Sequence, residues 1–323
     1  MSSGRAYDAG MRFAIGIPQL YPDGTFSPSD FKSYLARVEE LGVYESAWTQ
    51  EMTLGAAPRL APLEVLTYAA ACTSTLRLGC TVFVTTLHTP VHLAKGLATL
   101  DQLSGGRLEI GVGSGGPRRP FAAFGMSADR WLPRFTEGLA LMKALWTEPS
   151  VTFDGEFWQL KEAPMAPKPY QKPYPRLWFG GSAATAVRRG VQLCDGFFGA
   201  GSSATSAFAA QVAVVREALA ADPAGRRVGF GPGEFPIAKR IYIGIDQSSG
   251  ARAREEMNDA LAGVYGARVP AIESAAVAGT VAECLDGVRA VAAAGAEMIL
   301  FTPLYDIPEH MELIADTIIP AIR

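Results

Sequence analysis

Two glycine turns, each directly after a strand-like run, are the segments of this sequence best suited to chemistry. The first ends the stretch Leu97–Gly116, LATLDQLSGGRLEIGVGSGG, which has the pattern of a helix, a turn, a strand and a glycine loop. The second lies in Leu177–Ser182, LWFGGS. Because glycine has no Cβ, the bare backbone of such turns can approach a phosphate or a flat ring. Ligands of parallel α/β folds bind at the carboxyl ends of strands, so the sequence predicts a ligand at these turns.

The second turn leads into a helix whose first residues are suited to hold an anion. Gly180, Gly181 and Ser182 end one expected strand, and the expected helix Ala183–Cys194 starts directly afterwards. The free N–H groups and the positive dipole end of that helix would face a ligand there. Ser182 and Thr185 are three residues apart, so both hydroxyls can reach one phosphate. Plain N-capping by Ser182 is the alternative role.

Short apolar runs alternate with helical patterns along the chain, which is typical of βα units around a parallel sheet. The expected strands are Arg12–Pro18, Ser46–Thr49, Arg77–Val84, Leu108–Gly113, Arg176–Phe179, Gly196–Gly199, Ile237–Ile243 and Met298–Leu304. The expected helices are Pro28–Leu41, Pro62–Thr73, Pro90–Leu103, Arg130–Trp146, Ala183–Cys194, Ala204–Ala221, Gly250–Tyr265 and Thr280–Ala294, with a closing helix near Pro308–Ile322. Eight strands that are each followed by a helix predict an α/β fold, a closed (β/α)8 TIM barrel, in one domain over residues 1–323.

Three segments interrupt this regular alternation. Gly115–Asp129 separates the fourth strand from its helix, and Gly266–Gly279 follows the seventh helix without a clear element of its own. Within Pro149–Pro175, Val151–Phe153 and Phe157–Gln159 flank an Asp-Gly pair and predict a hairpin. Long excursions at the carboxyl ends of strands often form lids or pocket walls, with surface packing as the alternative.

Composition narrows the class of ligand. The chain has 323 residues, 49% of them hydrophobic, and a net charge of −3 with both signs interspersed. This balance argues against a nucleic-acid partner or a polybasic membrane patch, and favours small neutral or hydrophobic ligands. No uncharged run has the length of a bilayer span, and Met1–Gly10 lacks the apolar core of a signal peptide. We therefore expect a cytoplasmic protein.

Metal and dithiol chemistry are not expected. The four cysteines are widely spaced and form no CxxC pair, which indicates buried, reduced thiols. His88, His92 and His310 are the three histidines. His88 and His92 are four residues apart, but Pro90 between them places the start of a helix there, so a shared metal is not expected.

Several segments together resemble the bacterial luciferase-like monooxygenases, a superfamily of flavin-dependent monooxygenases and coenzyme F420-dependent oxidoreductases. The matching stretches are ELGVYESAW (Glu40–Trp48), LRLGCTV (Leu76–Val82), TLDQLSGGRLEIGVGSG (Thr99–Gly115), LMKALWTEPSVTFDGEFWQL (Leu141–Leu160), PKPYQKPYPRLWFGGS (Pro167–Ser182), CDGFF (Cys194–Phe198) and GTVAECLDGVRAVAAAGAEMILF (Gly279–Phe301). Their order across eight βα units carries the resemblance.

The resemblance implies a redox coenzyme, FMN or coenzyme F420, over the carboxyl-terminal mouth of the barrel. Gly113 and Ser114 would then end the fourth strand where a Cβ would block a planar ring. Thr81 and Val82 match the position at which many members bend the backbone beneath the ring, often through a cis peptide bond. The resemblance thus implies a bend there, with Val82 pressing on the central ring, and leaves the cis bond open.

Glu51 is the candidate proton-handling or coenzyme-binding residue. It follows the second strand in SAWTQEM, where family members often have an acidic residue followed by histidine. Here the next residue is Met52, which cannot take a proton. This departure makes dehydrogenation with that histidine as the base doubtful. A solvated acid at a strand end is the other role open to Glu51.

The resemblance leaves the reaction itself open between oxygen insertion with reduced FMN and hydride transfer with F420. A separate flavin or F420 reductase would supply reduced coenzyme, the substrate would be a small organic molecule, and a homodimer is expected because members commonly pair through their early helices. Two alternatives from other classes remain, a non-catalytic flavin-binding barrel and a redox-free TIM-barrel hydrolase that pairs Glu51 with a second carboxylate.

Four basic residues are candidates for contact with an anionic tail. Arg118 and Arg119 follow the first glycine loop, and Lys239 and Arg240 enter the seventh strand. For Lys239 an outward-facing charge is the favoured interpretation, while for the two loop arginines both roles stay open.

Overall fold

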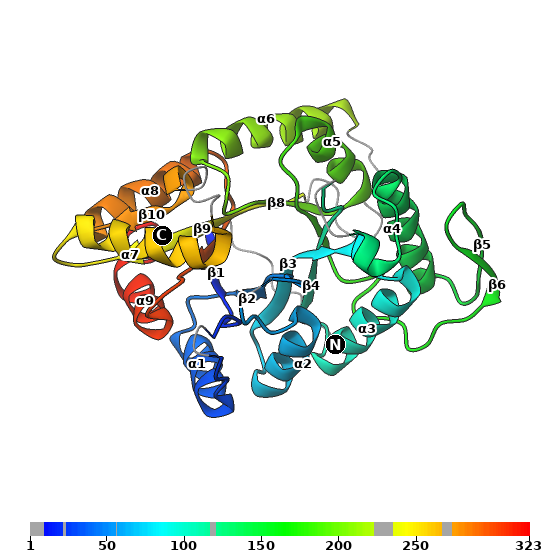
Figure 1. The fold of residues 1–323 in the computed structure, drawn as a ribbon, viewed down its shortest axis with the longest axis horizontal. Coiled ribbons are helices and arrows are strands. Elements are labelled where there is room, and N and C mark those ends of the chain that lie inside the picture. Colours follow the sequence, from blue (N-terminus) through cyan, green and yellow to red (C-terminus); the bar gives the residue numbers. More distant parts are fainter. Residues whose placement is uncertain (1–9, 22–23, 56, 117–120, 223–234, 267–272) are drawn as a thin grey trace.

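The centre of the computed structural model is a closed barrel of eight parallel strands, and the helices follow one another around it in chain order (Figure 1). The structure describes residues 10–21, 24–55, 57–116, 121–222, 235–266 and 273–323. The barrel strands are β1 (Arg12–Gly16), β2 (Ser46–Thr49), β3 (Arg77–Val84), β4 (Leu108–Gly113), β7 (Leu177–Phe179), β8 (Gly196–Gly199), β9 (Ile237–Ile245) and β11 (Met298–Thr302). The helices are α1 (Pro28–Leu41), α2 (Pro62–Cys72), α3 (Pro90–Leu103), α4 (Trp131–Thr147), α5 (Ala184–Leu193), α6 (Thr205–Ala221), α7 (Gly250–Tyr265), α8 (Val281–Ala293) and α9 (Ile307–Leu313).

Strand pairing closes the barrel in the order β1, β2, β3, β4, β7, β8, β9, β11 and back to β1. Every one of these pairs is parallel, so all the carboxyl ends lie at one mouth. The predicted TIM barrel is confirmed. Prolines at the first helical positions of α1, α2 and α3 fix φ where no intrahelical N–H bond is lost, which explains why these helices begin where the sequence predicts.

The irregular segments differ from the sequence expectations in three places. Strand β9 runs two residues further than expected because a short strand that was not predicted, β10 (Val277–Gly279), pairs with its end. The hairpin consists of β5 (Val151–Asp154) and β6 (Gln159–Ala163), so its second strand starts later than predicted. Glu137 holds the intervening turn, since its carboxylate accepts the N–H groups of residues 156, 157 and 158. The closing helix α9 continues as a π-helical turn, Ile314–Ile318.

The barrel interior is layered from base to mouth. An apolar layer fills the middle, with one or two side chains from most strands: Ala14, Trp48, Trp178, Phe198, Ala238, Met298 and Leu300. Glycine at position 79 leaves space for the Trp48 ring of this layer, because a Cβ there would lie 2.4 Å from that ring. The layer separates the base of the barrel from its mouth. Among the described residues, no helix combines the length and the apolar character that a membrane crossing requires.

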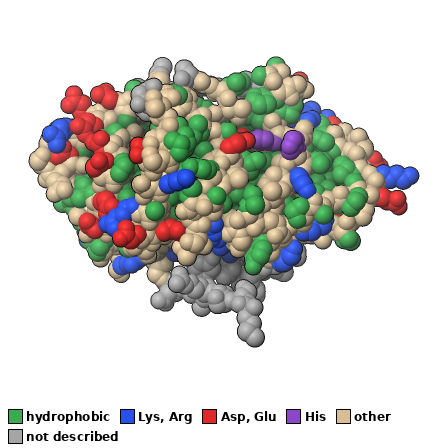
Figure 2. All heavy atoms as spheres, turned by 90° about the horizontal axis from the view of Figure 1, so that it is seen from below, with side chains coloured by type: hydrophobic (Ala, Val, Ile, Leu, Met, Phe, Trp, Pro, Cys, Tyr) green, Lys and Arg blue, Asp and Glu red, His purple; other side chains and the backbone are tan. Residues whose placement is uncertain are grey.

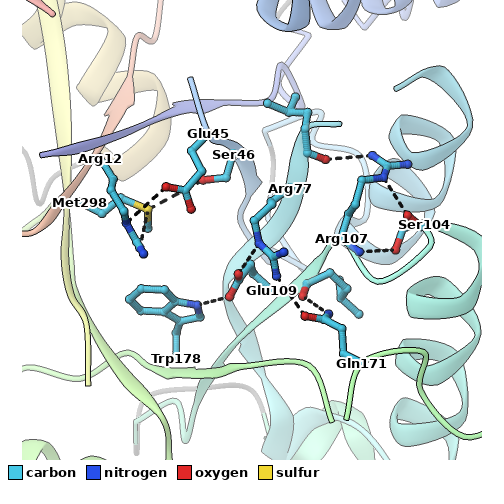
Figure 3. Close-up of polar contacts among 12 residues, drawn as sticks. Arg12, Glu45, Ser46, Arg77, Ser104, Arg107, Glu109, Gln171, Trp178 and Met298 are labelled. Atoms are coloured by element: carbon cyan, nitrogen blue, oxygen red, sulfur yellow. Dashed lines mark hydrogen bonds and ion pairs between the residues drawn. The ribbon is translucent and has the colours of Figure 1, made fainter. Parts of the chain in front are cut away.

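Two ion pairs, Arg12 with Glu45 and Arg77 with Glu109, lie at the base of the barrel (Figure 3). Glu109 accepts hydrogen bonds from Arg77 Nε and from Trp178 Nε1, each at 2.6 Å. Arg12 Nε lies 3.3 Å from a carboxylate oxygen of Glu45. Burial opposes the ionisation of Glu109, but Arg77, Arg176 and the two hydrogen bonds outweigh it and hold the pKa of Glu109 below its usual value. At the base of the barrel, Arg12 and Arg77 are therefore each paired with a glutamate.

We expect the substitution Glu109→Gln to lower the free energy of unfolding at neutral pH by about 3 kcal/mol, because it removes the buried carboxylate that is paired with Arg77 and hydrogen-bonded to Trp178. Since the pKa of Glu109 is lowered in the fold, its contribution is present above the ordinary glutamate pKa and is lost as the pH falls below it. The difference between the two proteins should shrink in acid. Urea unfolding followed by circular dichroism measures this. Glu217→Gln, which breaks the exposed pair with Arg188, is the matched control and should cost about 1 kcal/mol or less.

Candidate active site

Val82 lies where the two glycine turns meet at the mouth of the barrel. The ends of β4 and β7 are neighbours, since Gly180 N–H donates to Val112 O at 3.0 Å. A Cβ on Gly113 would lie 2.7 Å from one methyl of Val82, and a Cβ on Gly180 would lie 2.6 Å from the other. Both glycines therefore make room for Val82. The sequence suggested that these positions are glycine so that a ring can approach. The structure adds a second reason, which is that a Cβ at either position would overlap Val82.

The bend expected in β3 is present, and the peptide bond between Thr81 and Val82 is cis. The register of β3 against β4 shifts between Cys80 and Phe83, which brings the two backbones close together. A Cβ on Gly111 would lie only 2.1 Å from Cys80 O, so that position of β4 accepts glycine alone. Thr81 and Val82 remain half-buried. The close approach of β4 and the bent β3 thus places the Val82 side chain between the two turns.

The start of α5 has no side-chain cap. Its N-cap residue is Ala183, so Ser182 is not the N-cap and the alternative role of plain N-capping is wrong. Ser182 and Thr185 are both exposed and flank this end of the helix. The first N–H groups of α5 therefore have no side-chain acceptor at the cap. Gly181 and Ser182 lie at the same mouth as Ser114, whose carbonyl accepts a hydrogen bond from Thr86 Oγ1.

Glu51 pairs with a histidine that does not neighbour it in the sequence. Its Oε1 lies 2.6 Å from His88 Nε2, and its Oε2 accepts the N–H of Val84 at 2.5 Å. The carboxylate is 4% exposed, while the imidazole is 33% exposed. Glu51 is therefore not a solvated acid. Glu51 is a buried acceptor that orients an accessible imidazole.

A cavity of about 470 Å³ opens beside this pair and is lined by residues after β2 and β3 together with the starts of α2 and α3. The ionisable side chains that line it are Glu51, Arg59, Glu64, His88 and His92, and large apolar side chains around them are Met52, Leu63, Phe83, Leu87 and Leu93. Figure 2 shows histidine side chains beside an acidic one on this face, with hydrophobic side chains around them. The mixture suits a largely apolar molecule with a few polar groups.

Sequence reasoning missed His88 as a partner for Glu51, because it considered His88 only together with His92 as a metal ligand. The described residues contain no cluster of three or more side chains suited to a metal ion. The signal that could have found the pair is topological. β2 and β3 are neighbours, so a residue after the end of β3 meets one after the end of β2. The second carboxylate in the cavity, Glu64, is not hydrogen-bonded to Glu51, whose acidic oxygens are already occupied.

Lys239 does not face outward as predicted. It is 1% exposed, and its Nζ donates to the carbonyls of Ala200 and Ser203 at the end of β8. Burial, reinforced by the neighbouring Arg240, lowers the pKa of Lys239 to about 7. Two carbonyl acceptors in the turn after β8 explain why this charge is tolerated inside. The other predicted basic pair, Arg118 and Arg119, lies outside the described residues.

We expect Gly180→Ala to destabilise the protein by about 2 kcal/mol, since its Cβ would overlap a methyl of Val82. Val82→Ala removes that methyl, so the double variant should recover at least half of the loss. Thermal unfolding of the three variants measures the coupling between the two positions. Gly263→Ala, at a helical glycine with open space around its Cβ position, is the control and should not lower stability. Additive losses at positions 82 and 180 would contradict this packing.

Comparisons with known proteins agree with this architecture. Solved structures with the same fold include the monooxygenase RslO1 from Streptomyces bottropensis, with a TM-score of 0.79, 24% identity and coverage of 96% of this chain and 99% of that one. An F420-dependent secondary alcohol dehydrogenase in complex with an F420–acetone adduct has a TM-score of 0.80 at 17% identity, over 97% and 99% of the two chains. At these identities the likeness concerns the fold.

Two curated relatives show sequence similarity over part of the chain. An FMNH(2)-dependent dimethylsulfone monooxygenase from Pseudomonas putida is 34% identical over 153 residues, which is 46% of this chain and 41% of that protein. An F420-dependent glucose-6-phosphate dehydrogenase from Amycolatopsis mediterranei is 31% identical over 182 residues, 53% of each chain. The matches thus span about half the length of these relatives. The model of the family described as luciferase-like monooxygenase matches residues 10–298, and the chain therefore belongs to that family.

Proposed function

We propose that this protein is an oxidoreductase that binds reduced FMN or coenzyme F420 at the mouth of the barrel and acts on a small organic molecule. The observation that carries the proposal is the packing of Val82 between Gly113 and Gly180, beside the uncapped start of α5. It puts bare backbone, an apolar contact and free N–H groups at one mouth. The names of the curated relatives support the same coenzyme class, since one uses FMNH(2) and another F420.

The residues at the mouth fit such a coenzyme. Gly180, Gly181 and Ser182 present backbone without bulky side chains, and Ser182 and Thr185 add exposed hydroxyls at the start of α5. We assign the phosphate to that end of the helix, where N–H groups and the dipole favour an anion. Thr81, Val82, Gly113 and Ser114 would contact the ring. When bound, either coenzyme supplies the redox chemistry, oxygen activation for FMN or hydride transfer for F420.

Glu51 and His88 would handle the proton of the reaction. Both oxygens of Glu51 lie beside donors, Val84 N–H and His88 Nε2, which holds the imidazole with its Nε2 proton toward the carboxylate. The Nδ1 lone pair is then free to accept a proton from a substrate in the cavity. Met52 departs from the family pattern, but His88 supplies the missing imidazole from the segment after β3. This pair favours a catalytic barrel over a non-catalytic flavin-binding one.

Titration of the coenzyme-free protein with FMN and with F420 separately, followed by tryptophan fluorescence, tests the proposal. Saturation by one of the two selects the chemistry. If FMN is bound, a separate reductase is the expected source of reduced coenzyme. Binding of neither would remove the proposed function.

The phosphate position has its own test. We expect Ser182→Asp to weaken coenzyme binding roughly hundredfold, because it sets a negative charge beside the anion site at the start of α5. Ser203→Asp is the matched control, since Ser203 likewise precedes the N-cap alanine of a helix, α6. That variant should bind coenzyme as the unaltered protein does. Equal losses in both variants would show that the phosphate is not specific to α5.

The Glu51–His88 pair can be tested without a substrate. Nitrogen NMR of the imidazoles should show His88 protonated on Nε2 at alkaline pH, and Glu51→Gln should weaken this preference because an amide is a poorer acceptor than a carboxylate. His92, which lies on α3 and lines the same cavity, is the internal control and should keep its spectrum. If the His88 signals do not change in Glu51→Gln, Glu51 does not orient the imidazole and the proposed role is contradicted.

A further inference from the structure

Two arginines at the barrel mouth have no acidic partner among the described residues. Arg59 lies in the segment between β2 and α2 and lines the cavity. Arg240 lies on β9 and is 7% exposed. The Nε atom of each guanidinium is buried and has no hydrogen-bond partner in the described part of the chain. Backbone contacts hold Arg59 in place. It forms an isolated antiparallel β-bridge with Leu20, and its N–H donates to Ala57 O at 2.8 Å.

The two guanidinium groups come from opposite sides of the mouth. In the barrel order, β1 and β11 stand between β2 and β9, so a residue after β2 and one on β9 can meet only over the lumen. Burial lowers the pKa of Arg59, and the positive charge of Arg240 lowers it further, against the opposite effect of the tyrosines. Arg240 Nη2 also donates to the hydroxyl of Tyr242 at 2.8 Å. That hydroxyl is hydrogen-bonded to Tyr265, at the end of α7.

These neighbours orient the cations but do not neutralise them. Tyrosine hydroxyls are uncharged at neutral pH, and burial raises the pKa of Tyr242 further. Of the two acids in the cavity wall, Glu51 already accepts from His88 and from Val84 N–H, and among the described residues Glu64 forms no ion pair with Arg59. At the base of the barrel, by contrast, Arg77 and Arg12 each face a glutamate. Burial lowers the pKa of Arg59, whereas Tyr242 and Tyr265 raise that of Arg240 against the effect of burial. A buried guanidinium with no carboxylate beside it is further stabilised when an anion binds to it.

We propose that Arg59 and Arg240 form a subsite for an oxyanion, and that the substrate carries it as a carboxylate or a sulfonate. This inference rests on the proposed function, because it names the substrate class of that site. Guanidinium forks suit such groups, since they donate two parallel hydrogen bonds to a planar or tetrahedral oxyanion. The apolar wall of Met52, Leu63 and Phe83 then accepts the body of the molecule, with His88 beside it. The coenzyme phosphate is the other possible source of the same chemistry.

Thermal unfolding of the coenzyme-free protein with benzoate, and with its neutral analogue benzamide, tests the subsite. Benzoate should raise the unfolding temperature and benzamide should not, because a ligand that binds only the folded state stabilises it. Arg59→Gln and Arg240→Lys should each weaken the apparent affinity for benzoate roughly tenfold or more, through loss of charge-assisted or forked hydrogen bonds. Arg188→Gln, at an exposed ion pair away from the cavity, should keep the response. No benzoate response, or an unchanged one in Arg59→Gln, would overturn the proposal.

Coenzyme titrations of the same variants separate the two sources of the anion. If the substrate supplies it, Arg59→Gln binds FMN or F420 as the unaltered protein does while the benzoate response is lost. If instead Arg59→Gln weakens coenzyme binding as strongly as Ser182→Asp, the subsite belongs to the coenzyme phosphate and the substrate assignment is overturned. Failure of the proposed function has a different signature, since neither coenzyme would then bind the unaltered protein, whatever benzoate does.

Discussion

The contact of Val82 with Gly113 and Gly180 is the constraint on which the candidate site depends. It joins three adjacent strands, β3, β4 and β7, at the end where all the strands point. A larger residue at either glycine would displace Val82, and a straight β3 would not bring Val82 there, because the register shift after Cys80 sets its position. The local geometry of the mouth is therefore fixed by main-chain proximity rather than by long side chains.

Much of the fold followed from the sequence because its signals are local. Proline and glycine at the ends of elements and apolar runs of strand length placed all eight barrel strands and their helices. The three-residue strand β10 is too short to have a pattern, and the hairpin turn depends on Glu137, which lies in another element. The glycine turns were found from their residue types, whereas their contact with Val82 depends on how three strands pack.

The side chains of the candidate site were harder to predict, since their partners lie far apart in the sequence. Glu51 and His88 are 37 residues apart and meet because β2 and β3 are neighbours. Lys239 was expected at the surface because lysine seldom lies inside, and two carbonyls of the turn after β8 override that tendency. The base and the mouth of the barrel also differ in a way that no local pattern reveals. Arg77 is paired with Glu109 at the base, whereas Arg59 and Arg240 at the mouth have no acidic partner among the described residues.

The position of His88 changes what residue 52 is free to do. In a site that takes its imidazole from the position next to the acid, that position cannot vary without loss of the proton carrier. In the proposed site the imidazole comes from a different loop, and Met52 is left as a flexible apolar part of the cavity wall. Substrate preference can therefore drift through substitutions at this one position during evolution, while the acid and its distant partner stay as they are.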